Sequence, residues 1–464
     1  MSSLAATGSG LSKRRRTVEG SCWPCKQRRV KCDLQRPVCR RCVQSHQGDC
    51  NYDKFLLKWK QRPASSVPNT QLQLSLEQIL DGSPLLVNER RAIDYFKVRL
   101  WPLFSTIHEP CPPPIALALR SQPVLHALYV FAEEHRALQE GVSSKQTSER
   151  RRLHALTAIR DQLGDNKAEQ TALPALLVAV LLLYFLEGYV NCTNDDASTR
   201  CHLTGALAII NALGGFLSVW SSSDRITRML LSELASTDLT DALLQDRRPS
   251  FPATVWGFME PGSAWWEDVP GSASLGSVLS IMSEMSCYHH ELTAGCSVDI
   301  NKGQEFEYAL QPTYGMLDYG GTTCVEVGSR SEVTPHFSTA SLCLIRSFQH
   351  AGLIYLYSAI HNIPKEHFLV QQHVNACLEC IHSMGTRSKA QNCALFPLYV
   401  AGAHTITDTH RSSVLGILDN IHANIMFQSV ISIGSALRQV WECTPCPSTW
   451  TDIFQNSAPC TLVI

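Results

Sequence analysis

The residues with the most distinctive chemistry are six cysteines that lie within 29 residues near the start of the chain. The stretch reads Cys-x2-Cys-x6-Cys and then Cys-x2-Cys-x7-Cys, so the spacing repeats. Cysteine pairs separated by two residues are typical zinc ligands, because a tight turn brings both thiolates to one side of a tetrahedral ion. The pattern therefore predicts a metal cluster. Its candidate ligands are Cys22, Cys25, Cys32, Cys39, Cys42 and Cys50.

The number of thiolates bears on the number of metal ions. Two zinc ions need eight ligand positions, and six thiolates fill them only if two thiolates bridge both ions. A single zinc held by Cys22, Cys25, Cys39 and Cys42 is the competing arrangement, and it would leave two cysteines without a metal. A disulfide framework is disfavoured because the first residues lack the apolar core of a secretory signal, so we expect an intracellular chain with reduced thiols. We expect two zinc ions per chain.

The two halves of the repeat differ in charge. The segment KQRRVK between Cys25 and Cys32 carries four basic side chains, whereas VQSHQGD between Cys42 and Cys50 carries no Lys or Arg. Arginine can grip the O6 and N7 atoms of guanine, and lysine suits phosphates. We therefore expect double-stranded DNA as the partner. The candidate DNA contacts are Lys26, Arg28, Arg29, Lys31, Arg36, Arg40 and Arg41.

The formal net charge of -1 hides an uneven distribution. Residues 1–62 hold 15 basic and 4 acidic side chains, and the remaining 402 residues hold 25 basic and 37 acidic ones. Only the basic head is expected to meet a polyanion. Its first basic run is a candidate nuclear localisation signal and a further source of phosphate contacts. That run is Lys13, Arg14, Arg15 and Arg16.

The six-cysteine stretch resembles the DNA-binding domain of the fungal zinc binuclear-cluster transcription factors. The shared features are the cysteine spacing, the basic segment between the second and third cysteines, and a proline in the middle loop, here Pro37. The resemblance implies that Cys22 and Cys39 bridge two zinc ions and that Arg28 and Arg29 lie at the groove-reading end of the first helix. It also implies CGG-like sites, although the family usually has lysine where this chain has Arg29.

The chain after the cysteines is expected to be a linker and then a helical domain. Pro63, Ser65 and Pro68 mark the linker, and residues 71–80 hold at most two heptads, too few to predict a coiled coil. The oligomeric state is therefore left open. From about residue 85, apolar residues recur at helical spacing, with Asn88 as the expected cap of the first helix. Sustained β alternation is scarce, and residues 250–335 give no clear pattern.

The most apolar run, Ala172 to Leu186, is 15 residues long and contains Pro174. A membrane span needs roughly 20 apolar residues, so we expect a buried core helix and no membrane association. The pairs Cys377-x2-Cys380 and Cys443-x2-Cys446 could form a second zinc site. Buried cysteine more often serves as a small apolar side chain, and we favour that interpretation.

Several phrases of the large domain resemble the regulatory domain that follows the zinc cluster in one subgroup of the same family. They include ERRAIDYF, LTGALAIINALGG, FQHAGLIYLYSAIHNIP and LFPLYVAGAH, and they span roughly residues 85–445. In the sterol-responsive members this domain binds a small lipid, so a small-molecule effector is a candidate partner. The sequence contains no phosphate-binding loop, dinucleotide fingerprint or nucleophile elbow, and we expect no enzymatic activity.

The predicted fold class is a small two-zinc, six-cysteine cluster domain with two short helices and loops, followed by a large all-α domain. The predicted parts are a basic arm at 1–20, the cluster at 21–53, a linker at 54–84 and the helical domain at 85–464. The predicted function is a nuclear, sequence-specific transcription factor of the RNA polymerase II type, with DNA and the transcription machinery or co-regulators as partners. The alternatives are a ligand-sensing regulator and a thiol-based metal or redox sensor.

Overall fold

The computed structural model divides the chain into two units, Met1–Leu74 and Ser75–Ile464. Within the residues it describes, every regular element is a helix and none is a strand, as predicted. The basic arm, the linker and the short heptad segment lie outside the described residues. The described residues are 21–22, 24–25, 28, 30–45, 50, 87–141, 145–164, 172–192, 197–269, 272, 274–295, 299, 301–312, 335–443, 449–454 and 463.

The first unit is built around sulfur in place of a hydrocarbon core. Five of its six cysteines are buried, and Val30 and Cys50 pack partly buried against them. Pro24 and Cys25 are helical, and α2 spans Arg40–Gln44. Elements this short cannot bury enough apolar surface to fold by themselves, so a unit of this size depends on its metal.

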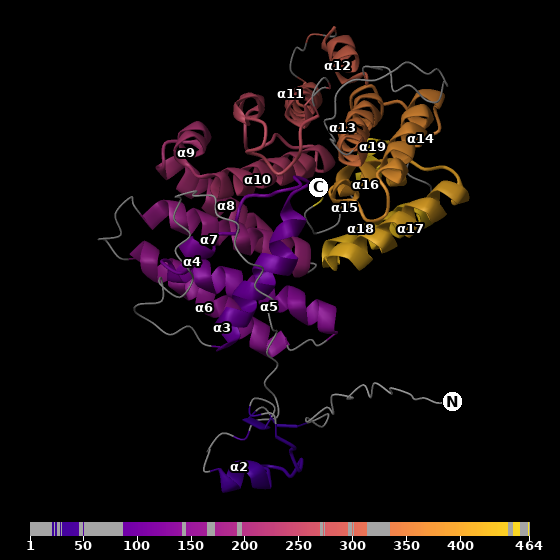
Figure 1. Ribbon diagram of the computed structural model, residues 1–464. Helices are drawn as coiled ribbons and strands as arrows, with labels where there is room; N and C mark the ends of the chain where they lie inside the picture. The colour runs from indigo at the N-terminus through magenta and orange to yellow at the C-terminus, as the bar shows by residue number, and fades with distance from the viewer. Residues whose placement is uncertain are drawn as a thin grey trace, which may run out of the picture. The chain divides into compact units, whose positions relative to one another are not determined.

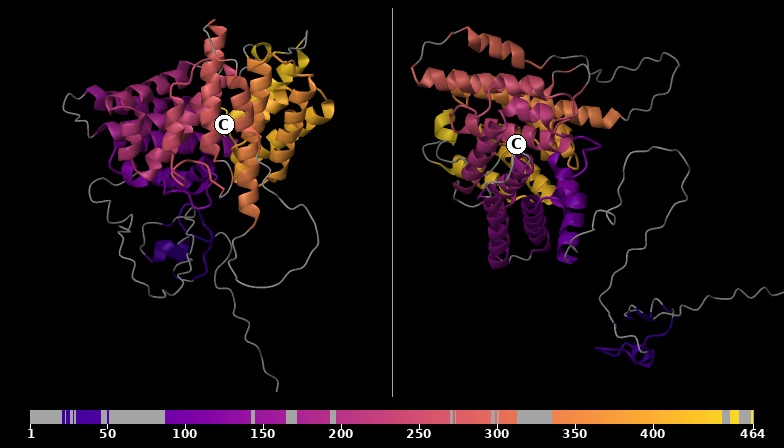
Figure 2. Two further views of the ribbon diagram at one scale, coloured as in Figure 1. Left: turned by 90° about the horizontal axis from the view of Figure 1, so that it is seen from above. Right: turned by 90° about the vertical axis from the view of Figure 1, so that its left-hand side faces the viewer.

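The N-terminal half of the second unit packs around helix α5. This helix contacts α3, α6 and α7, and α7 contacts α8. Figures 1 and 2 show these indigo to magenta helices gathered on one side of the unit. The elements, with η for short 3₁₀ or π-helical segments, are α3 (Val87–Tyr95), η1 (Phe96–Leu100), η2 (Trp101–Phe104), α4 (Ile115–Ala118), α5 (Gln122–Glu140), α6 (Lys145–Gly164), α7 (Leu173–Phe185), η4 (Leu186–Val190), α8 (Ala197–Ala212), α9 (Phe216–Ser222) and α10 (Arg225–Leu244).

The C-terminal half packs around the helices α13, α14 and α16, each of which contacts the other two. Its orange and yellow helices lie on the opposite side of the unit in Figures 1 and 2. The elements are η5 (Ala253–Phe258), α11 (Leu275–Thr293), α12 (Lys302–Leu310), α13 (Pro335–Tyr355), η6 (Leu356–Ile360), α14 (Phe368–Ser383), α15 (Lys389–Asn392), α16 (Leu395–Ala403), α17 (Asp408–Ile425), α18 (Gln428–Glu442) and α19 (Trp450–Phe454).

Helix α7 is the buried core helix that its composition predicts. Every residue from Leu176 to Phe185 is buried, because a helix that is apolar on all sides has no face to give to water. The stretch Leu173–Val190 is long and apolar enough to cross a membrane, but 83% of it is buried inside the protein. That burial is typical of the core helix of a soluble protein.

Two sequence expectations for this unit need correction. Asn88 is not a cap, because α3 already includes Val87 and Asn88 in its first turn. The unclear segment 250–335 contains the 19-residue helix α11, and the preceding helix α10 was not predicted either. In contrast, Gly214 and Gly215 end α8 with positive φ angles of 93° and 92°, as glycines after a helix commonly do.

Candidate metal centre and nucleic-acid interface

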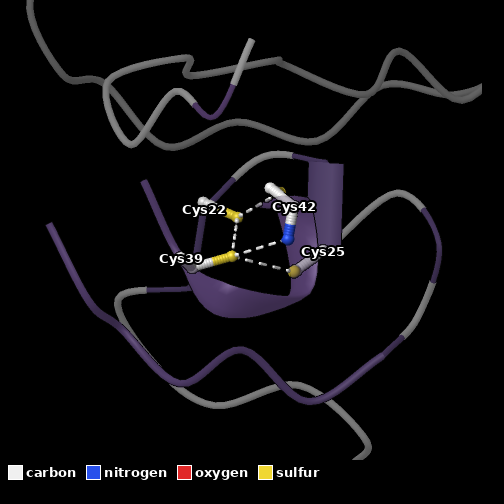
Figure 3. A group of neighbouring side chains, drawn as sticks. All are labelled: Cys22, Cys25, Cys39 and Cys42. Carbon is white, nitrogen blue, oxygen red and sulfur yellow. Dashed lines mark hydrogen bonds between the residues drawn. The ribbon is translucent and has the colours of Figure 1, made fainter. Parts of the chain in front are cut away.

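The sulfur atoms of the first unit converge on a small volume. The Sγ atom of Cys22 lies 3.6 Å from those of Cys39 and Cys42 and 3.8 Å from that of Cys32. The Sγ atoms of Cys25 and Cys39 are also 3.6 Å apart. Figure 3 shows the side chains of four of these residues pointing toward one another. The sequence prediction that both halves of the repeat build one cluster agrees with this geometry.

The spacing and the chemistry of these sulfur atoms fit zinc. Zinc–thiolate bonds of about 2.3 Å at tetrahedral angles place the ligand sulfurs about 3.8 Å apart. The observed sulfur separations of 3.6–3.8 Å are close to that value. Among the described residues, the group Cys22, Cys25, Cys39 and Cys42 has its ligand atoms within 4.8 Å of one another, and all four residues are buried.

Backbone N–H groups point at several of these sulfurs. Cys32 Sγ accepts the N–H of Leu34 at 3.4 Å, and Cys39 Sγ accepts the N–H of Cys42 at 3.4 Å. Cys50 Sγ accepts the N–H of Cys39 at 3.3 Å. Such donors favour the thiolate form that a metal requires. Cys39 occupies the N-cap of α2, where the helix dipole adds to the effect.

Burial of the sulfur atoms, in contrast, favours the protonated thiol over the thiolate. It raises the pKa of the Cys22 thiol and brings that of Cys42 to about 12. Burial also opposes the ionisation of Cys39, but the hydrogen bond from the Cys42 N–H and those from neighbouring thiols lower its pKa overall. Without a cation, the Cys22 and Cys42 thiols would therefore hold their protons at neutral pH. Metal binding must therefore release protons.

The described basic residues of this unit are not equivalent. Four of them are exposed: Lys31 in the first half of the repeat, Arg36 between the halves, and Arg40 and Arg41 in the second half. Arg28 is also exposed, and its guanidinium contacts the cysteine cluster itself: Nη2 lies 3.6 Å from Cys42 Sγ. Lys26 and Arg29, like Lys13, Arg14, Arg15 and Arg16, lie outside the described residues.

Two contacts of this site were missed by the sequence reasoning. Asp33 accepts the backbone N–H of Arg40 at 3.1 Å, so a carboxylate holds the first turn of α2. The Oε1 atom of Gln35 accepts a hydrogen bond from Nε–H of Arg40 at 3.1 Å and orients the arginine side chain. A capping pattern spans three or four residues, whereas Asp33 precedes Arg40 by seven. No local signal could have revealed it.

The second proposed zinc site gains no support. Cys377 is buried in α14, where its Sγ lies 3.5 Å from the carbonyl oxygen of Ser347 and 3.6 Å from that of Pro397. Within the described part of the chain, the groups with metal-ligand geometry lie in the first unit. Cys377 therefore behaves as a small core side chain. Cys446 lies outside the described residues.

A cavity beside Glu233 in the helical unit bears on the hypothesis of a small-molecule effector. This cavity has a volume of about 20 Å³, room for about one water molecule. Drug-sized ligands occupy pockets of roughly 300–1,000 Å³. A lipid would therefore need this part of the fold to open. The lining residues are Leu103, Phe104, Tyr189, Glu233, Asn392, Cys393, Leu395, Ile425 and Phe427.

A zinc-thiolate unit with exposed basic side chains, followed by a large helical unit, defines a zinc-cluster transcription regulator. Comparison with protein families agrees: residues 20–58 match the fungal Zn(2)-Cys(6) binuclear cluster domain. Residues 91–301 and 318–462, well over half of the chain, match the fungal specific transcription factor domain. The chain belongs to this family of fungal zinc-cluster transcription factors and takes two zinc ions as its cofactor. No curated protein and no solved structure matched it.

Proposed function

We propose that this transcription factor acts in the nucleus on genes read by RNA polymerase II and recognises CGG-like sites in double-stranded DNA. The observation that carries the proposal is the buried cluster of sulfur atoms at zinc-ligand spacing within a unit whose described Lys and Arg side chains are exposed. With no hydrocarbon core to cover, exposed basic residues such as Lys31 and Arg41 can face a polyanion. The basic arm 1–20 adds nuclear import and sequence-independent phosphate contacts.

All six cysteines are assigned as zinc ligands, with Cys22 and Cys39 as the bridging pair. The sulfur contacts support this assignment. Cys22 approaches Cys32 of the first half and Cys42 of the second, and Cys39 approaches Cys25 while its N–H binds Cys50. A ligand shared by two metals must contact the ligands of both. Zinc supplies the charge that keeps the thiolates ionised and closes the fold of this unit.

The basic residues are assigned to different tasks. Arg29 is the main base reader, because its neighbour Arg28 is engaged with Cys42 and Pro24 and is less free to reach a base edge. Lys26, Lys31, Arg36, Arg40 and Arg41 are assigned to the phosphates, where point charges suffice.

The helical domain, proposed to span 85–464 after a linker at 54–84, is assigned a regulatory role without catalysis. Its partners are the transcription machinery or co-regulators. The ligand-sensing alternative requires an effector that opens the domain, and a thermal-shift series with small lipids would reveal one. The redox alternative leaves the basic residues around the cluster without a purpose.

The test is a site selection from a pool of random duplexes with the zinc-loaded full chain. We expect enrichment of CGG triplets. Arg29→Ala should cost about 1–3 kcal/mol on the selected site and relax the preference at the guanines. Arg41→Ala, the matched control on exposed α2, should weaken selected and random DNA alike. A wild-type pool with no enriched sequence would contradict sequence-specific recognition.

A further inference from the structure

Helix α6 presents three leucines to solvent, whereas two of its arginines, Arg151 and Arg152, face the protein. Leu153, Leu156 and Leu163 are 61%, 37% and 55% exposed. The helix is anchored instead by the small buried face of Ala155 and Ile159. In an amphipathic helix of a globular protein the large apolar side chains normally face the core. The orientation of α6 is therefore the reverse of the usual one.

Two buried carboxylates hold α6 in this rotation. Glu187, only 3% exposed, has its Oε1 2.9 Å from the Nε of Arg152. Glu133 of α5, 4% exposed, lies 3.6 Å from Arg151, whose guanidinium also stacks over the ring of Tyr129 at 5.2 Å. Turning the leucines inward would carry both arginines away from these carboxylates. Glu133 would keep Arg136, whose guanidinium lies 2.7 Å away, so the loss of Arg152 from the buried Glu187 contributes most to the cost of that rotation. The leucine face is thus fixed toward the outside.

The outward residues follow a seven-residue repeat. Glu149, Leu153, Leu156, Arg160 and Leu163 are separated by alternating steps of four and three, which is the spacing of the contact positions in a coiled coil. All five side chains are exposed. We call them the α6 seam. The seam carries opposite charges toward its two ends, with leucines between them.

We propose that the α6 seam pairs with the same seam of a second copy of this chain, with the two helices antiparallel. The seam is symmetric about a point midway between residues 154 and 155. Glu149 and Arg160 lie at equal distances from this point along the chain, and so do Leu153 and Leu156. One twofold axis at that point sets each leucine against the partner's other leucine and each end charge against its opposite. A parallel pair would set like charges against each other, so the charge pattern selects the antiparallel arrangement.

The contact is small. Two heptads from one helix bury less than the roughly 1,000 Å² expected of a stable interface, so the dimer is weak in solution. Two chains bound to neighbouring DNA sites would raise their effective concentration and strengthen it. Only this last step rests on the proposed function, because the seam contact itself can be measured without DNA.

The experiment is sedimentation equilibrium of the zinc-loaded full chain up to about 100 μM, a concentration suited to a weak contact. We expect a monomer–dimer equilibrium. Glu149→Arg or Arg160→Glu alone should weaken the dimer about two- to tenfold, and the double variant should restore it. Leu153→Ala with Leu156→Ala should weaken it about tenfold or more. Leu153→Ala alone, at the more exposed of the two positions, should weaken it with little change in the thermal melting temperature.

A matched control reverses a charge off the seam. Arg150 is exposed and lies about 100° further round the helix than Glu149, so Arg150→Glu should leave the dimer intact. A chain that stays monomeric throughout, a dimer that no seam variant weakens, or a double charge variant no better than the single ones would each overturn the proposal. Circular dichroism of every variant separates these outcomes from unfolding.

Discussion

The substitution Arg28→Ala tests whether Arg28 stabilises the zinc cluster or reads DNA bases. In the structure the Arg28 side chain bridges the two halves of the repeat: Nε donates to the Pro24 carbonyl at 3.2 Å, and Nη2 lies 3.6 Å from Cys42 Sγ. Pro24 belongs to the first cysteine turn and Cys42 to the second. Removing the guanidinium should therefore loosen the junction of the cluster and weaken zinc binding.

The expected size of the effect follows from this geometry. A hydrogen bond to a charged group contributes about 1.5–3 kcal/mol when shielded from water. Arg28 is exposed and the contact to sulfur is long, so we expect the lower end or less, about 1 kcal/mol, which is about fivefold in zinc affinity. Arg28→Lys keeps the charge but lacks the second nitrogen, and it should fall between Ala and the wild type.

The assay is competition for zinc against a chromophoric chelator, followed by DNA titration at saturating zinc. Arg41→Ala is the control, since this exposed arginine of α2 changes the net charge of the unit by the same amount. We expect Arg28→Ala to lower zinc affinity and to keep its preference for the selected site once zinc is saturating. Unchanged zinc affinity together with a lost sequence preference would show that Arg28 reads bases, and our assignment would be wrong.

Four further outcomes are expected. Elemental analysis should find two zinc ions per chain; Cys22→Ala should lower the affinity for both, whereas Cys50→Ala should leave one site intact, and an equal loss from both variants would argue against Cys22 as a bridge. Because burial brings the pKa of the Cys42 thiol to about 12, zinc must displace its proton, so zinc affinity should fall as the pH falls from 8 to 6; chelator competition at each pH would show a flat profile if the thiols were already ionised. Neutralising Lys13 to Arg16 should weaken binding to all duplexes and reduce the salt dependence, whereas a loss confined to the selected site would contradict a phosphate role for the arm. Trp450→Ala should destabilise the helical unit by about 3–5 kcal/mol in urea unfolding, because the ring is 1% exposed and its Nε1 donates to a carbonyl of α10; a change below about 1 kcal/mol would mean that α19 is not part of the cooperative core.

The zinc cluster could be predicted from the sequence because its ligands lie close together along the chain. Six ligands within 29 residues must meet around the metal, whatever the rest of the chain does. The all-α class and the buried helix α7 could also be predicted from the sequence. A continuous run of apolar residues is stable only in the protein core, where α7 lies. The family resemblance stated for these segments is confirmed by the matches to both domains.

Helix α10 was not predicted because its buried residues include polar side chains that become clear only in the packed structure. Its buried face includes Ser232, Ser236 and Thr237. The hydroxyl of Ser236 donates to the carbonyl of Ser232 at 2.8 Å, and that of Thr237 donates to the carbonyl of Glu233 at 3.0 Å. Hydroxyls satisfied inside their own helix can be buried at little cost, so the helix needs no regular apolar stripe.

The direction in which a helix faces is likewise decided outside its own sequence. The periodicity of ERRRLHALTAIRDQL predicts a helix, and α6 confirms it. Which side faces the core depends on Glu133 and Glu187, which come from other helices and reach Arg151 and Arg152 only in the folded unit. The same holds for Arg28, whose contact with Cys42 forms only when the cluster closes. Residue spacing along the chain determines which helix forms and which cysteines can share a metal. The partners of a charged side chain are determined by tertiary contacts, because a buried charge is stable only with an opposite charge beside it.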